Sequence, residues 1–109
     1  LDAVTAVSGS GPAYFFLLME HMTKTGIELG LDPDTSRKLT LQTAFGAALM
    51  AQQSTDTLTT LRQNVTSPGG TTEAAVNTML EHGMPEAIAS ALRAAQQRSV
   101  QLSKEFGAS

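Results

Sequence analysis

The sequence predicts an all-α fold of about five helices, with a long helix toward each end of the chain. Apolar residues recur at steps of three and four positions over most of its length, which is the period of an amphipathic helix. Proline and glycine stand where these periodic runs begin and end. No alternating strand pattern of useful length follows Val7, and no segment repeats at a fixed period. Helix packing must therefore supply the core.

The first long helix is expected from about Pro12 to Gly30. Residues 8–12 are rich in serine and glycine and predict a turn. Pro12 suits the first helical position, because the N–H that proline lacks would have no acceptor there. Gly30 readily takes the left-handed conformation of a helix stop. Residues 13–19 are apolar on every side, so we expect them to be core or interface side chains.

A second helix is expected to start at Asp32-Pro33-Asp34, where a capping carboxylate precedes a proline. Residues 54–56 break its pattern, and a short third helix over 57–63 is expected to turn Leu58 and Leu61 inward. The small residues of the second helix allow another helix to approach closely: Ala44, Gly46, Ala47, Ala48 and Ala51.

The fourth helix is expected from about Pro68 to His82, with Gly83 as its stop. The residues expected to be buried on it are Ala75, Val76, Met79 and Leu80. A fifth helix begins at Pro85 and is expected to end near Gly107. Its apolar stripe comprises Ile88, Leu92, Ala95, Ser99, Leu102 and Phe106.

Length and composition limit the classes of protein that the chain can belong to. At 109 residues it is expected to form a single domain, and its start at Leu1 suggests that the domain is excised from a longer protein. It has no cysteine, which excludes disulfides, zinc–thiolate sites and thiol nucleophiles and fits a reducing compartment, so we expect a cytoplasmic protein. A formal charge of −3 without a basic run disfavours nucleic-acid and anionic-membrane partners.

Two stretches carry no charge, Ala3 to Met19 and Leu39 to Thr55. Both contain polar or turn residues that make them poor membrane spans. Helices without charge are buried on more than one face, which a chain of this length can hardly achieve alone. We therefore expect a partner subunit to cover these segments.

The most informative segment is Asn64-Val-Thr-Ser-Pro-Gly-Gly-Thr-Thr72, just before the fourth periodic run. Its proline predicts a helix start, with Ser67 as N-cap and Pro68 as the first helical residue. Gly69 and Gly70 would let another molecule approach the first-turn amides, where the helix dipole favours an anion. The hydroxyls that would assist belong to Ser67, Thr71 and Thr72. The alternative is ordinary loop and cap chemistry without a ligand.

Other groups of residues give weaker evidence of a functional site. Gly9-Ser10-Gly11 precedes a helix as in a dinucleotide fold, but Tyr14 stands at the third glycine position and no second strand with an acidic end follows. Ser10 does not lie in a G-x-S-x-G elbow, so we do not expect a nucleophile there. His21 and His82 lack the spacing of metal ligands, and Glu73 is expected to cap a first helical turn.

With both glycine-rich segments placed, the chain resembles the C-terminal domain of pyrroline-5-carboxylate reductase. Residues 2–14 resemble the opening segment of that domain, and residues 61–72 resemble its signature segment. The resemblance implies a helical domain that intertwines with its copy, like the C-terminal domain of 6-phosphogluconate dehydrogenase. It also implies dimers, in some members larger rings, and a Rossmann domain for NADP or NAD that is absent from this chain. The reaction implied is reduction of the cyclic imine 1-pyrroline-5-carboxylate to L-proline, in which the fragment alone is expected to be inactive.

The resemblance also implies roles for individual residues. Thr72 matches the threonine whose hydroxyl meets the substrate ring nitrogen, and Thr71 and Ser67 match positions around the substrate carboxylate. Asn64 matches a cofactor-contacting position. Because threonine is too weak an acid to protonate an imine alone, Thr72 would orient a protonated iminium or relay a proton from water. The alternative function is a helical dimerisation module without chemistry.

Overall fold

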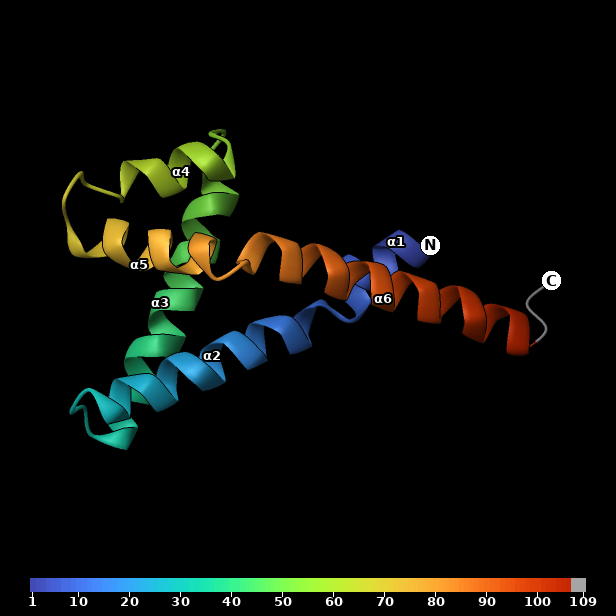
Figure 1. The fold of residues 1–109 in the computed structure, drawn as a ribbon, viewed down its shortest axis with the longest axis horizontal. Helices are drawn as coiled ribbons and strands as arrows, with labels where there is room; N and C mark the ends of the chain where they lie inside the picture. Colours follow the sequence, from blue (N-terminus) through green and yellow to red (C-terminus); the bar gives the residue numbers. More distant parts are fainter. Residues whose placement is uncertain (107–109) are drawn as a thin grey trace. The chain divides into compact units, whose positions relative to one another are not determined.

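The computed structural model describes residues 1–106, and every regular element in that range is helical (Figure 1). The elements are α1 (Asp2–Val4), the π-helix η1 (Thr5–Gly9), α2 (Gly11–Glu28), α3 (Pro33–Gln53), α4 (Leu58–Asn64), α5 (Thr71–Glu81) and α6 (Met84–Glu105). Helices α2 to α6 confirm the predicted all-α class and the order of its five helices. None of the described helices is long and apolar enough to cross a membrane.

The described chain divides into two compact units, the first formed by Leu1–Tyr14 together with the chain from Ala74 onward. In this unit α6 packs against η1 and α1. Two hydrogen bonds made by side chains stabilise this unit. The Ser99 hydroxyl donates to Oδ1 of Asp2 at 2.6 Å, and the Tyr14 hydroxyl donates to the carbonyl of Ala6 at 2.6 Å. Ala6 is buried, so this unit has its small core where η1 meets α6.

The turn predicted over residues 8–12 is mostly helical in the structure. The N–H of Ser10 donates to the carbonyl of Thr5 at 2.8 Å, which is the bond of a π-helix. The Ser8 hydroxyl donates back to the carbonyl of Val4 at 2.9 Å. Helical hydrogen bonds thus pair backbone N–H and C=O groups that a turn would leave unpaired. Only Ser10 separates η1 from α2.

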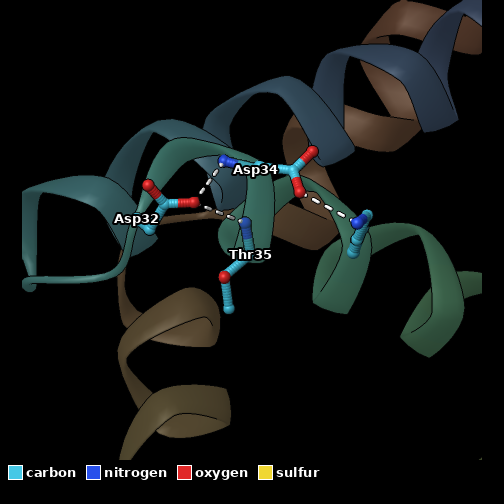
Figure 2. Close-up of polar contacts among 4 residues, drawn as sticks. Asp32, Asp34 and Thr35 are labelled. Atoms are coloured by element: carbon cyan, nitrogen blue, oxygen red, sulfur yellow. Dashed lines mark hydrogen bonds and ion pairs between the residues drawn. The ribbon is translucent and has the colours of Figure 1, made fainter.

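The second unit comprises Phe15–Glu73 and contains the hairpin of α2 and α3. As predicted, Gly30 ends the first helix with a left-handed φ of +112°. The N–H of Gly30 donates to Ile27 and that of Leu31 to Gly26, each at 3.0 Å, which is the Schellman pattern. Asp32 then caps α3, its Oδ2 accepting from the N–H groups of Asp34 at 3.1 Å and Thr35 at 3.3 Å (Figure 2).

Helices α2 and α3 touch through a small polar contact. The Ser36 hydroxyl donates to the carbonyl of Thr23 at 2.8 Å, and Ser36 is only 2% exposed. A Cβ on Gly26 would collide with Oγ of Ser36, so only glycine permits this approach. The hairpin is therefore joined near its turn by a hydrogen bond and a close backbone approach.

The third helix, α4, has Thr57 as its N-cap, which accepts from the N–H of Thr60 at 3.1 Å. Leu58 stays 73% exposed, so its predicted inward orientation is wrong within this chain.

In the last helices, Gly83 has a φ of +80° and separates α5 from α6 as predicted. Helix α6 ends at Glu105, and Gly107, the predicted end, lies outside the described residues.

Apolar side chains are mostly exposed within this chain. Ala6 is the one buried apolar residue of the described range, and α5 has no buried residue, so the burial predicted for its apolar stripe is wrong within the single chain. On α2, Phe15 is 62%, Phe16 65% and Leu17 58% exposed. These neighbouring residues point in different directions around the helix, so the chain itself leaves much of that turn uncovered.

Candidate functional site

The predicted site residues lie in one continuous segment of the second unit. Asn64 is the last residue of α4, Ser67 lies in the following turn, and Thr71 and Thr72 are the first two residues of α5. All four are exposed. The segment thus offers one amide and three hydroxyl groups to a molecule that approaches from outside the chain.

Ser67 to Gly70 form a β-turn, which corrects the predicted helix start. The N–H of Gly70 donates to the carbonyl of Ser67 at 3.1 Å, and Gly69 has a φ of +75°. Proline at the second and glycine at the third position are typical of a type II turn. The left-handed backbone of Gly69 cannot continue into a helix, so α5 begins at Thr71. Ser67 is therefore not its N-cap, and Pro68 is not its first residue.

The two glycines meet different requirements of the turn. Gly69 supplies the positive φ, and a Cβ placed on it would meet nothing within 4 Å, so the space beside it is open. A Cβ on Gly70 would lie 3.2 Å from the carbonyl oxygen of Ser67, a distance that only a local shift would relieve. The turn closes tightly on one side and leaves its tip accessible.

Both glycine amides already have acceptors inside the chain. Oε1 of Glu73 accepts from the N–H of Gly69 at 3.0 Å, and the carbonyl of Ser67 takes the N–H of Gly70. The interpretation that these two amides face a ligand is therefore corrected. Thr71 and Thr72 lie in the first turn of α5, where backbone N–H groups have no acceptor within the helix and the dipole favours negative charge.

The residues before the turn tie it to α4. The Thr66 hydroxyl donates to the carbonyl of Arg62 at 2.5 Å, and the N–H of Thr66 donates to the carbonyl of Gln63 at 3.0 Å. These bonds satisfy carbonyls at the end of α4, which otherwise lack helical partners. Asn64 is thereby held at a defined end of a helix, just ahead of the Ser67–Gly70 turn.

Two contacts escaped sequence reasoning. For the bond between Glu73 and Gly69, the only signal in the sequence was the position of Glu73 in the first helical turn. That position predicted a capping role for Glu73 but did not identify the N–H of Gly69 as the donor. The bond between Ser99 and Asp2 joins residues 97 positions apart, and no local pattern signals a contact of that range. That second contact depends on where the chain returns in space.

The helical fold, the exposed apolar helices and the turn before α5 define an all-α domain of a recognisable kind. Residues 1–102 match the family described as pyrroline-5-carboxylate reductase dimerisation. The chain belongs to this family.

Individual relatives agree with this assignment. The chain is 55% identical over 107 residues to the pyrroline-5-carboxylate reductase of Pseudomonas aeruginosa, covering 98% of this chain and 39% of that protein. It is 44% identical over 106 residues to pyrroline-5-carboxylate reductase 1 of Bacillus subtilis, covering 97% of this chain and 36% of the relative. The chain therefore spans well under half the length of these curated relatives.

Solved structures show the same similarity. The pyrroline-5-carboxylate reductase of Coxiella burnetii matches 93% of this chain and 37% of its own, with a TM-score of 0.90 and 44% identity. The pyrroline carboxylate reductase of Plasmodium falciparum, described with NADP bound, matches 90% of this chain and 37% of its own, with a TM-score of 0.86 and 34% identity. The all-α fold is thus shared with a segment of these enzymes.

Proposed function

We propose that the chain is the dimerisation and substrate-binding part of a reductase that converts 1-pyrroline-5-carboxylate to L-proline in proline biosynthesis. In this reaction the imine carbon gains a hydride from NAD(P)H and the ring nitrogen carries a proton. The observation that carries the proposal is the exposed start of α5, which directly follows the Ser67–Gly70 turn. The membership of the chain in the reductase dimerisation family supports it.

The substrate carboxylate is proposed to lie at the first turn of α5. The backbone N–H groups of Thr71 and Thr72 have no helical acceptor, and the helix dipole stabilises an anion at that end. The exposed Ser67 hydroxyl adds a donor from the turn. The Thr72 hydroxyl is proposed to contact the ring nitrogen, where it orients an iminium that is protonated already or relays a proton from water.

The hydride is proposed to come from NADPH or NADH held mainly by an N-terminal Rossmann domain outside this chain. Asn64 is exposed at the end of α4 and carries both a donor and an acceptor, so it suits a cofactor contact next to the substrate. NADP in the Plasmodium falciparum structure supports a nicotinamide cofactor here. Within this chain, Ser67, Thr71 and Thr72 are proposed to bind and orient the substrate.

A second copy of the chain is proposed as the main partner, and further association of dimers is proposed for the whole protein. The family is described as a dimerisation family, and the exposed apolar turns of α2 need a cover. The protein is proposed to work in the cytoplasm, without nucleic-acid or membrane partners.

The experiment that tests this function uses the full-length reductase that contains the chain. Thr72→Ala should lower kcat by about tenfold to hundredfold, because a donor at the reacting nitrogen acts in the transition state. Thr72→Ser keeps the hydroxyl and should retain most of kcat. The measurement is the oxidation of NADPH at saturating pyrroline-5-carboxylate, with circular dichroism as the control for folding.

Two results would overturn the assignment. A wild-type protein that does not reduce pyrroline-5-carboxylate, and whose Gly69 to Thr72 amide resonances do not shift on titration with L-proline, would leave a dimerisation module without chemistry. An unchanged kcat in Thr72→Ala would remove that hydroxyl from the mechanism even if the wild type is active.

A further inference from the structure

Glu73 holds the turn that precedes the helix bearing the proposed substrate site. It is the third residue of α5, it is half-buried, and its Oε1 accepts from the N–H of Gly69 at 3.0 Å. The turn is thus fastened twice, once by the bond from Gly70 to Ser67 and once by the carboxylate that reaches back from the helix.

The contact is favoured by two effects. A hydrogen bond from an amide to an ionised carboxylate is stronger than one between neutral groups. A negative charge in the first helical turn is also stabilised by the helix dipole. The arrangement is similar to the returning half of a capping box, in which a glutamate at the third helical position takes a backbone N–H from just before the helix.

The same contact separates the charge of Glu73 from a ligand at the helix start. An unattached carboxylate in the first turn would compete with a substrate carboxylate for the amides of Thr71 and Thr72. Because the Glu73 carboxylate accepts from the N–H of Gly69, it leaves the N–H groups of Thr71 and Thr72 to the substrate. It also ties the turn that contains Ser67 to the first turn of α5.

We propose that Glu73 is a positioning residue for the substrate carboxylate, acting through the N–H of Gly69. This inference rests on the proposed reductase function. Glu73 does not touch the substrate in this arrangement; it holds the Ser67–Gly70 turn against the start of α5 so that Ser67, Thr71 and Thr72 present their donors together.

The test compares Glu73→Ala, Glu73→Gln and the control Glu81→Ala in the full-length reductase. Glu81 is an exposed acidic residue at the opposite end of the same helix, so its removal changes the net charge equally without touching the turn. In Glu73→Ala we expect KM for pyrroline-5-carboxylate to rise by roughly fivefold to tenfold, with kcat and KM for NADPH within about twofold of wild type. Product inhibition by L-proline should weaken by the same factor as KM rises.

Glu73→Gln supplies the decisive comparison, because glutamine keeps an acceptor oxygen for the Gly69 amide. We expect it to restore KM to within about threefold of wild type. A substrate KM in Glu73→Ala within twofold of wild type would overturn the proposal. So would a Gln variant no better than Ala, an equal rise in Glu81→Ala, or a fall in kcat without a change in KM.

The outcomes separate this inference from the function on which it rests. A wild-type enzyme that fails to reduce pyrroline-5-carboxylate contradicts the proposed function itself. An active wild type whose substrate KM is insensitive to Glu73→Ala contradicts only the positioning role.

Discussion

Single residues decide how closely the second unit can pack. At the contact between α2 and α3, the absent side chain of Gly26 and the small side chain of Ser36 act together. The hydroxyl of Ser36 has its acceptor in the carbonyl of Thr23, and a methyl group on Gly26 would occupy the place of that hydroxyl. A buried hydroxyl that loses its acceptor retains its desolvation penalty, so the two positions are energetically coupled.

Gly26→Ala is expected to destabilise the protein by about 2 kcal/mol through overpacking and the displaced hydrogen bond. Ser36→Ala alone should cost about 1 kcal/mol, because it removes the donor without a clash. In the double variant the clash with Oγ is gone, and the next atoms, Cδ1 of Leu31 and Cβ of Ser36, each lie at an ordinary 3.4 Å from the added methyl group. Urea unfolding at one protein concentration should therefore give a double-variant loss smaller than the sum of the single losses. Additive losses would show that the positions do not interact.

At the candidate site, the four predicted residues lie in one short segment, and the shape of their backbone was not predicted. Asn64, Ser67, Thr71 and Thr72 are close in the chain, so their grouping needed no tertiary information. Ser-Pro is compatible both with a capped helix start and with the first half of a β-turn. The positive φ of Gly69 decides for the turn, and glycine admits either backbone, so the residue type alone cannot settle the matter.

At the scale of elements, the stops after α2 and α5 and the start of α3 were the most predictable features because they are set by local chemistry. Gly30 and Gly83 end helices with a left-handed backbone, and Asp32-Pro33 begins one. The π-helix η1 was not predicted, since its hydrogen bonds extend only one residue further than those of an α-helix and leave no pattern in residue types. The exposure of Leu58 and of the α5 stripe was missed because periodicity identifies an apolar face without saying which molecule covers it.

Asp32→Ala is expected to destabilise the protein by about 1 kcal/mol, because the N–H groups of Asp34 and Thr35 lose their capping acceptor. Asp34→Ala is the matched control from the same helical turn. The Asp34 side chain pairs with Lys38 at 2.9 Å, but the two side chains are 69% and 76% exposed. Solvent screens such a pair, so its loss should cost no more than about 0.5 kcal/mol. Thermal unfolding followed by circular dichroism would compare them, and equal losses would contradict the capping role.

At the scale of the whole molecule, apolar exposure is the feature that demands explanation. Phe15, Phe16 and Leu17 are each more than half exposed, and on α3 Phe45 is 63% and Met50 56% exposed. These residues lie in the two charge-free stretches for which the sequence predicted a partner subunit. Exposed apolar surface of this kind marks interaction sites in soluble proteins.

Phe16→Glu is expected to weaken the proposed dimer of the full-length reductase by about hundredfold in dissociation constant, because a charge replaces a large apolar side chain at the contact. His21→Glu places the same charge on an exposed polar position of α2 and should leave the dimer intact. Analytical ultracentrifugation over a micromolar concentration series would measure both. A Phe16→Glu protein that dimerises like the wild type would place the contact elsewhere.

The uncovered turn of α2 also bears on how the protein reaches its native state. When apolar side chains are buried only by a second copy of the chain, folding and dimerisation become a single equilibrium. The melting temperature should then climb as the solution is made more concentrated, and dilution alone should favour unfolding. For such a chain, resistance to heat is a property of the pair.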